Sequence, residues 1–467
     1  MKRFLVSSKI GLACLALCLA VAGAWAFRQK SAVAPAVRVA VAPNPLAALP
    51  PVTSGSTLTD KTIAKWSAQA RKEPTNRFVW SNLGSALMQK ARETADASYY
   101  GHAERAYQQA LALDPKSVEA LTGMAWVNGG RHEFEKSIEW ARKALALDAR
   151  NNDAFGLIGD AQVEMGDYEA AFTAYQQMVD IRPDIASYSR GAHLLWLSGN
   201  KRKATWLMYK ALRTGAPYAE NTAWCATQLA MILYSTGAII PADQTLQETL
   251  KKSPHNYRAL ALLGRVKAAR KEYKAAIEYY RKSIEIVPQV DSLAALGDLY
   301  VLTGNKAEAE KQYALVDTID ALNKANGVRG GWQRAMFLAD HDRDLPKALK
   351  EAQDEYVTRK NVYAADTLAW CLYKSGRTQE AADMIQTALK HNTPEALFSF
   401  HAGMIYTKLG DRRVASLCLS RALSMNGNFH PFYTQTAADT LNELGSRQPS
   451  SAAASQAKSP VLASQRR

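Results

Sequence analysis

An acid and histidine cluster at Asp340, His341, Asp342 and Asp344 is the densest group of side chains that could do chemistry in this sequence. Carboxylates and an imidazole at this spacing could bind a cation in a loop. The same residues also suit a polar turn, because Asp commonly initiates a helix and Pro346 follows at an early helical position. Between these two interpretations we expect the turn, and no metal site.

Catalytic patterns are missing elsewhere. The eight histidines are scattered, and no pair at positions i and i+4 stands beside a carboxylate, as a zinc-protease helix would require. No glycine-rich phosphate loop opens a helix, and there is no Gly-x-Ser-x-Gly sequence for a nucleophile. We therefore predict that the protein is not an enzyme and needs no cofactor; an enzyme built around His341 is the least favoured hypothesis.

The elements that would position any site repeat along the chain. A bulky residue precedes a small one, and twelve positions later comes Ala or Ser, as in Ile158-Gly159 with Ala171. Successive small positions lie 33 to 39 residues apart, most often 34, with Met336 in a degraded copy: Ala125, Gly159, Ala192, Ala230, Gly264, Gly297, Met336, Ala369 and Gly403. Small residues on two facing helices let their backbones approach closely. The register therefore predicts stacked pairs of antiparallel helices.

Turn residues delimit these pairs. Six glycines follow the small residue by seven positions, where a tight turn between two helices needs positive φ: Gly166, Gly199, Gly237, Gly304, Gly376 and Gly410. Pro183 and Pro288 stand where a second helix should end. In the first unit, residues 91–100 predict a hairpin loop longer than the others.

These units resemble tetratricopeptide repeats. Residues 152–185 match that pattern through Phe155, Ile158, Gly159, Ala171, Tyr175 and Pro183, and residues 257–290 match it at the equivalent positions. The resemblance implies an all-α, right-handed superhelical solenoid of about ten helical hairpins, from Arg77 to Phe429, with a flanking helix at each end. It implies a protein-binding role and says little about the partner.

A solenoid of this family lines its concave face with the first helix of each hairpin and usually holds a partner segment there. Aromatic and Arg side chains make favourable anchors. Projecting the repeat spacing places nine candidates on or near that face: Trp126, His193, Trp196, Trp224, Tyr234, Arg265, Trp370, Tyr373 and Phe400. The alternative for each aromatic residue is packing against the neighbouring hairpin.

The two ends of the chain differ from the array. Residues 1–26 combine a basic start, an apolar run and Ala24-Trp25-Ala26, the pattern of a cleaved signal peptide; an uncleaved membrane anchor through residues 10–26 is the alternative. Residues 27–58 predict a flexible Ala- and Pro-rich linker, 59–445 the solenoid, and 446–467 a disordered tail. The protein is thus expected to be periplasmic or secreted, or anchored in an inner membrane and facing the periplasm.

Net charge argues against a nucleic-acid partner. The formal charge is +15, but residues 1–58 and 446–467 contribute +10 without a single acid, which leaves +5 for the array. Basic groups such as Lys201-Arg202-Lys203 are interpreted as solvated helix ends with acids nearby. Three cysteines lie beyond residue 26, and a bridge between Cys371 and Cys418 is left open against buried free thiols.

The sequence supports two functional hypotheses. The first is a scaffold in the cell envelope that binds an extended segment or a helix of a partner in its concave groove. The second is a membrane-tethered accessory subunit of a secretion or polysaccharide-export assembly that uses its outer helices. Gly327, Gly330 and Gly331 also predict a hinge near residues 323–345.

Overall fold

The computed structural model describes residues 49, 55, 57–215, 218–328 and 331–446. The predicted signal segment, nearly all of the linker and the residues after Ser446 lie outside this part. The described helices belong to one compact unit that begins at Pro43. No helix among the described residues combines the length and the apolar character needed to cross a bilayer.

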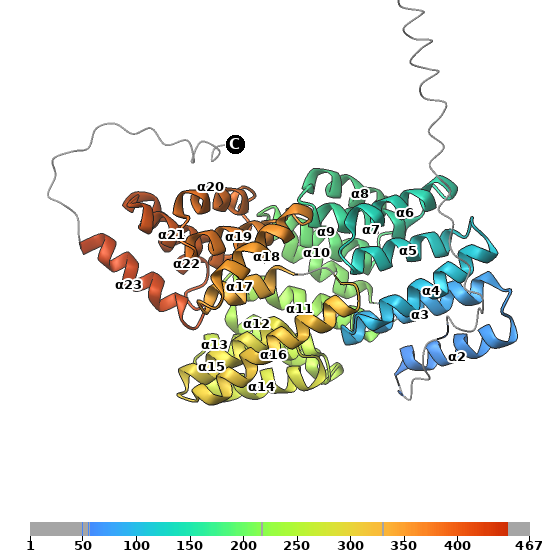
Figure 1. Ribbon diagram of the computed structural model, residues 1–467, viewed down its shortest axis with the longest axis horizontal. Coiled ribbons are helices and arrows are strands. Elements are labelled where there is room, and N and C mark those ends of the chain that lie inside the picture. The colour runs from blue at the N-terminus through green and yellow to red at the C-terminus, as the bar shows by residue number, and fades with distance from the viewer. Residues whose placement is uncertain (1–48, 50–54, 56, 216–217, 329–330, 447–467) are drawn as a thin grey trace, which may run out of the picture. The chain divides into compact units, whose positions relative to one another are not determined.

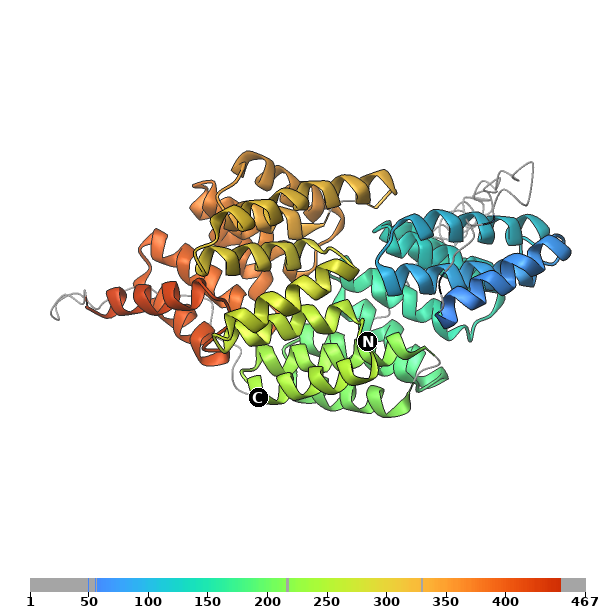
Figure 2. The same cartoon turned by 90° about the horizontal axis from the view of Figure 1, so that it is seen from below.

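Twenty-two helices, and no strand, make up the described residues, which confirms the all-α solenoid (Figure 1). α2 (Leu58–Lys72) and α23 (Tyr433–Ser446) flank ten helical hairpins. The hairpins are α3 (Arg77–Thr94) with α4 (Ser98–Leu113), α5 (Val118–Gly130) with α6 (Phe134–Leu147), α7 (Asn152–Glu164) with α8 (Tyr168–Ile181), α9 (Ile185–Leu197) with α10 (Lys201–Thr214), α11 (Ala219–Ser235) with α12 (Ile239–Lys252), α13 (Tyr257–Ala269) with α14 (Tyr273–Ile286), α15 (Val290–Leu302) with α16 (Lys306–Ala325), α17 (Trp332–Asp340) with α18 (Leu345–Thr358), α19 (Val362–Lys374) with α20 (Thr378–Leu389), and α21 (Ala396–Leu409) with α22 (Arg412–Met425). Figure 2 shows these hairpins stacked in chain order from a second direction.

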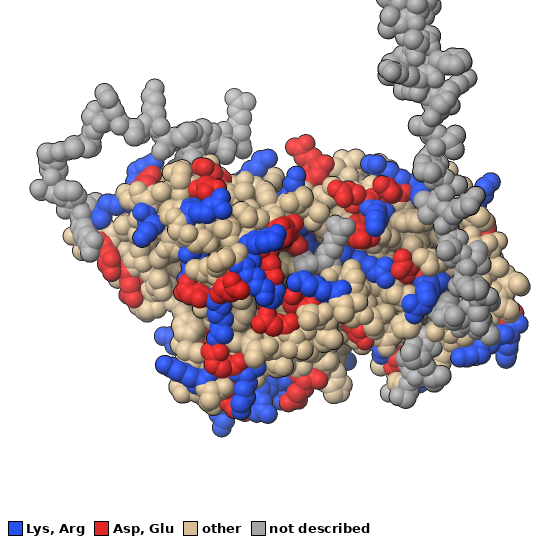
Figure 3. All heavy atoms as spheres, viewed as in Figure 1, with Lys and Arg blue, Asp and Glu red and all other residues tan. Residues whose placement is uncertain are grey.

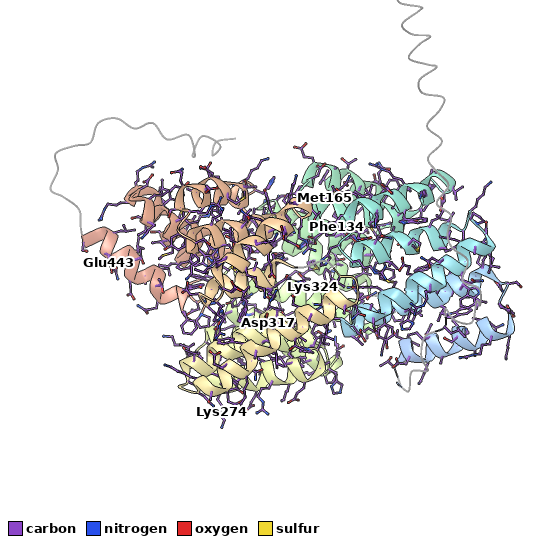
Figure 4. The ribbon with its side chains drawn as sticks, viewed as in Figure 1. Phe134, Met165, Lys274, Asp317, Lys324 and Glu443 are labelled. Carbon is purple, nitrogen blue, oxygen red and sulfur yellow. The ribbon has the colours of Figure 1, made fainter. Side chains whose placement is uncertain are left out.

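The small residues of the repeat register lie where the two helices of a hairpin meet. A Cβ on Gly159 would be 2.3 Å from the ring of Tyr175, and one on Gly297 would be 2.2 Å from the ring of Tyr313. Only glycine leaves room for these tyrosines, which are themselves buried. The core therefore runs as a series of packed layers between successive helices, and Figure 4 shows two side chains of one layer, Phe134 and Met165.

The first hairpin differs from the sequence prediction in its loop. Residues 91–100 do not form a long loop: α3 continues to Thr94 and α4 begins at Ser98. The extra residues lengthen the two helices to 18 and 16 residues, because Met88 and Ala91 carry the buried stripe of α3 for a further turn. Ala95, at φ 51°, ends that helix in the left-handed conformation.

Around the predicted hinge, α16 is 20 residues long and α17 only 9. Arg334 of α17, almost fully buried, pairs with Asp317 and Asp320 of α16 and with Glu351 of α18. Asp317 is labelled in Figure 4. Residues 329 and 330 are outside the described part, so hinge motion here stays a prediction.

Three hairpin turns contact three loops that follow much later in the chain. Gly166, Gly199 and Gly237 end α7, α9 and α11, and a Cβ on them would lie 2.4, 2.8 and 3.1 Å from the carbonyl oxygens of Lys360, His391 and Met425. Lys360 and His391 lie in the loops before α19 and α21, and Met425 is the last residue of α22, just before the loop that leads to α23. We call these three contacts the seam.

Hydrogen bonds fix the seam in register. Tyr168 accepts one from the backbone N–H of Val362, Thr393 donates one to the carbonyl of Leu197, and Asn426 donates one to the carbonyl of Tyr234. Apolar side chains support them, since Val362 and Phe398 pack into the core of α7 to α11. Repeats six hairpins apart are thus bonded directly, beyond the neighbour-to-neighbour contacts of a simple array.

Candidate functional site

The concave side of the first five hairpins contains a cavity of about 640 Å³. Its walls come from α3, α5, α7, α9 and α11, the first helices of consecutive hairpins. The lining includes aromatic, amide and charged side chains: Gln89, Trp126, Asn151, Asp160, Arg190, His193, Asn221 and Trp224. A second cavity of about 570 Å³ shares Trp126, Asp160 and His193 and reaches Arg258, Asp291 and Arg334. The two share these wall residues, and we call them together the concave cavity.

The repeat explains why these side chains converge. Trp126, Asp160 and His193 each follow the small residue of their first helix, so the register that packs one side of the helix presents the next residue inward. All three are half-buried, as a cavity wall requires. Successive hairpins therefore contribute one inward side chain each, at a spacing set by the stacking of the solenoid.

Two carboxylates in or beside the cavity, Asp160 and Glu220, are paired with arginines. Arg190 donates hydrogen bonds to both carboxylate oxygens of Asp160, from Nε at 2.8 Å and from Nη2 at 2.9 Å. Tyr175 donates a hydrogen bond of 2.8 Å to the same carboxylate. Glu220 pairs with Arg92 at 2.7 Å and with Arg258 at 3.2 Å. Ion pairs of this kind fix side-chain positions and leave little free charge for a strongly ionic ligand.

The cavity wall presents amide and aromatic groups to a ligand. The Oδ1 atom of Asn221 is buried and lacks a hydrogen-bond partner. The ring of Trp224 carries the guanidinium of Arg92 at 5.3 Å from its centroid, and burial lowers the pKa of His193, which favours the neutral imidazole. Such a wall can hydrogen-bond a peptide backbone and pack against apolar side chains.

The structure separates the nine predicted site residues into two groups. Trp126, His193 and Trp224 line the concave cavity, Arg265 is exposed with its guanidinium 5.6 Å from the Tyr234 ring centroid, and Tyr373 is half-buried. The other four are buried in the core, with exposed fractions of 4% or less: Trp196, Tyr234, Trp370 and Phe400. A binding role for any of the nine stays a prediction.

Several cavity residues were not anticipated from the sequence. Asn151 is the N-cap of α7 and accepts a hydrogen bond from the Ala154 N–H, so its type is explained by helix initiation. Its Nδ2 donates to the Oγ1 of Thr122 at 3.2 Å, on the neighbouring first helix. Gln89 and Asn221 are also polar residues on first helices. The signal in the sequence is an amide at every second first helix, on α3, at the N-cap of α7 and on α11.

The acid and histidine cluster near residue 340 serves the fold. Asp344 caps α18 by accepting from the Lys347 N–H, and Asp342 and Asp344 both have positive φ, so the polar turn is what the structure contains. Asp340 accepts hydrogen bonds from the Trp370 Nε1–H at 2.8 Å and from the Tyr433 hydroxyl at 2.7 Å. Among the described residues no three His, Cys, Asp or Glu side chains are grouped to hold a metal ion.

The three cysteine thiols add no reactive group to the candidate site. Cys225, Cys371 and Cys418 are free, so the bridge that the sequence left open is not formed. Burial raises the pKa of the Cys225 thiol to about 12 and that of Cys418 to about 11. Both stay protonated at neutral pH, which makes them poor nucleophiles.

Two family models match segments of the chain, and both describe tetratricopeptide repeats, at residues 153–185 and 242–291. A TPR repeat-containing protein of Methanocaldococcus jannaschii is 21% identical over 79% of this chain and 67% of its own length. The general transcriptional corepressor trfA of Dictyostelium discoideum is 28% identical over 22% of this chain, and the match spans 7% of that protein.

Solved structures align over longer stretches. A chain of the crystal structure of the APC/C hetero-tetramer Cut9–Hcn1 aligns over 83% of this chain and 96% of its own length, with 13% identity and a TM-score of 0.38. Ten helical hairpins in the register of the family, together with the two matched segments, identify the chain as a tetratricopeptide-repeat protein.

Proposed function

We propose that this protein is an interaction scaffold that holds an extended segment of a partner protein in the concave cavity. The observation that carries the proposal is the convergence of inward side chains from five consecutive first helices on one hollow. An extended peptide needs donors and acceptors along its backbone and pockets for alternate side chains. The unpaired Oδ1 of Asn221 supplies an acceptor, and Trp126 and Trp224 supply apolar walls for side chains.

The paired charges support a peptide without a strong net charge. Asp160 and Glu220 are each bonded to arginines, so neither a cationic nor an anionic ligand gains a free partner from them. Desolvating an ion pair that is already satisfied would cost binding energy. The proposed segment is therefore one whose affinity comes from backbone hydrogen bonds and apolar side chains.

Photocrosslinking in cells tests the cavity directly. A benzoylphenylalanine at position 193, on the cavity wall, should give covalent adducts with one partner protein, and the double substitution Trp126→Ala/Trp224→Ala should reduce those adducts at least about tenfold, since aromatic anchors dominate interface energies. The matched control is Trp140→Ala on the second helix α6, whose ring is half-buried beside Lys143. Equal adduct yield in the double variant and in the control variant would reject the cavity as the binding site.

We also propose that the scaffold works in the cell envelope. The basic start, the apolar run and Ala24-Trp25-Ala26 support export, with cleavage before Phe27 or retention as an anchor. Sequencing the N-terminus of the chain purified from its own cells distinguishes these fates. A cytosolic chain that keeps Met1 or Lys2 would refute the envelope location and leave the cavity proposal standing.

A further inference from the structure

The outer face of α10 carries an aromatic and basic stripe. Arg202, Trp206, Tyr209 and Arg213 are spaced i, i+4, i+7 and i+11, which places them on one side of the helix. The exposed fraction is 62% for Trp206 and 49% for Tyr209, and both arginines are exposed. The opposite side of α10 is buried in the core. Two large aromatic side chains thus face solvent without a packing role in the fold.

This helix has charge of one sign. Five cations lie on α10, at Lys201, Arg202, Lys203, Lys210 and Arg213, and residues 185–219 contain no Asp or Glu at all. From the sequence we expected acids near Lys201-Arg202-Lys203. Within the part of the chain that the structure describes, no carboxylate pairs with any of the five cations. Lys210 instead lies over the rings of Tyr188, at 4.3 Å, and Trp206, at 5.5 Å.

Most other described second helices lack this run of cations, although α22 also carries only basic charges, at Arg412, Arg413 and Arg421. On α14, the second helix two hairpins later, Lys274, Arg281 and Lys282 alternate with Glu278 and Glu285. The face drawn in Figure 3 likewise shows basic and acidic side chains interspersed, and Lys274 is labelled in Figure 4. The single-sign charge of α10 is therefore not a general property of the second helices.

We propose that the outer face of α10 docks on an anionic lipid surface. Unpaired Lys and Arg side chains are attracted to anionic headgroups, and Trp and Tyr prefer the interface between headgroups and acyl chains. The second helices before and after α10 in the chain also expose apolar side chains, with Phe172 of α8 exposed by 56% and Ile240 of α12 by 63%. A basic helix face with large apolar residues on it is the pattern of an interfacial membrane contact.

The geometry favours a lipid surface over other polyanions. A single-stranded nucleic acid is usually held in a groove that tracks its backbone, whereas the stripe lies on the outer side of a second helix. The charge of an acidic protein would match the cations but would not account for the exposed Trp206 and Tyr209. A bilayer interface offers both negative charge and an apolar layer, so it accounts for all of these exposed residues together.

Vesicle sedimentation of the full-length chain tests this proposal. Vesicles of phosphatidylcholine with a third phosphatidylglycerol are compared with pure phosphatidylcholine, and the ratio isolates the charge-dependent part of binding. Residues 1–58 and 446–467 are also basic, so the α10 variants are needed to assign this part to α10. We expect tighter binding to the anionic vesicles at low salt and loss of this preference at high salt. Arg202→Glu/Arg213→Glu should lower binding to the anionic vesicles at least about tenfold. Trp206→Ala/Tyr209→Ala should also weaken it.

Lys274→Glu/Arg281→Glu on α14 is the matched control, with the same change in net charge, and should bind anionic vesicles within about twofold of the unmodified chain. All substituted residues are exposed, so circular dichroism should show unchanged helix content. Equal weakening by the α10 and α14 variants would overturn the proposal, and so would equal binding to the two vesicle types. Preferential binding of polyglutamate or of a single-stranded oligonucleotide over anionic vesicles would overturn it in favour of that other partner.

Discussion

Trp126 and Trp370 hold the same place in two hairpins, directly after the small residue of the first helix, yet their surroundings differ. Trp126 of α5 is half-buried on the wall of the concave cavity. Trp370 of α19 is 3% exposed: its ring stacks on His401 at 4.1 Å, and its N–H donates to Asp340. Position in the repeat determines which way a side chain points, and more distant elements determine whether anything covers it.

The covering elements belong to the C-terminal end of the chain. Tyr433 begins α23, hydrogen-bonds Asp340 and stacks on Phe400, which closes the inner face over α19 and α21. Across α5 and α7, residues of α16 and α17 line the far side of the concave cavity and leave it unfilled. The first half of the array thus keeps an open concave face, and the second half uses the same positions as core.

The strongest test of this contrast is truncation of the two tryptophans. Trp370→Ala should lower the free energy of unfolding by about 3–5 kcal/mol, because it leaves a cavity in a packed core and removes one of the two hydrogen bonds to Asp340. Trp126→Ala should cost less than about 1.5 kcal/mol, since its ring is partly solvated already. Urea unfolding followed by circular dichroism measures both. Similar losses in the two variants would contradict the division into an open and a covered half.

A second test concerns the seam that joins the two halves. Gly166 and Gly376 end equivalent first helices with φ of 79° and 81°, but a Cβ on Gly166 would be 2.4 Å from the Lys360 carbonyl oxygen and one on Gly376 meets nothing within 4 Å. Alanine should cost about 1–2 kcal/mol at Gly376, from backbone strain alone. At Gly166 it should cost a further ~1–3 kcal/mol from steric overlap.

Hydrogen exchange shows where that further loss acts. In Gly166→Ala the amide of Val362, which bonds the Tyr168 hydroxyl, should exchange faster than in Gly376→Ala. If Val362 is protected equally in both variants, the steric contact at the seam does not stabilise the docking of the two halves.

The smallest expected effect is a pH dependence at Glu395, at the start of α21. Burial raises the pKa of Glu395 to about 7 although Arg265 acts in the opposite direction, and the Ser235 hydroxyl across the seam donates to it at 3.3 Å. The folded chain therefore keeps this proton up to about pH 7, whereas the unfolded chain releases it near 4.5. The stabilisation is complete below pH 4.5 and is lost as the pH rises to about 7.

Glu395→Gln removes this dependence. The thermal midpoint of the variant, relative to that of the unmodified chain, should rise between pH 5 and pH 8. The comparison must use the difference between the two chains, because burial lowers the pKa of His430 to about 4 and gives that residue an opposite trend below pH 6.5. The exposed Glu285→Gln serves as the control, and a constant difference across the pH range would rule out a buried, protonated Glu395.

The fold could be predicted from the sequence because its information is local and repeated. Gly159 with Tyr175, and Gly297 with Tyr313, show why the register is strict: no larger residue fits against the ring. The loop predicted at residues 91–100 was wrong because a local apolar pattern overrode the repeat period. The period predicted where a turn should come, but the apolar stripe through Met88 and Ala91 continued the helix past it.

The site was less predictable, since covering and pairing depend on residues far apart in the sequence. Nothing near Trp370 indicates that Tyr433 will complete its surroundings, and nothing near Gly166 indicates that Lys360 will face it. Direction within a hairpin follows from periodicity, so Trp126, His193 and Trp224 could be placed on the concave side. Contacts between hairpins that are not neighbours produce no periodic pattern in the sequence.

The seam also restricts how this array can change in length. A linear solenoid can gain or lose a hairpin at little cost, because each unit contacts only the adjacent ones. Here the turns of α7, α9 and α11 meet the loops before α19, α21 and α23 as three matched pairs. Removing a single hairpin between α13 and α18 would shift all three pairs by one unit at once. The number of hairpins in that interval therefore behaves as a fixed dimension of the molecule, and insertions are expected to be tolerated in its turns rather than as whole repeats.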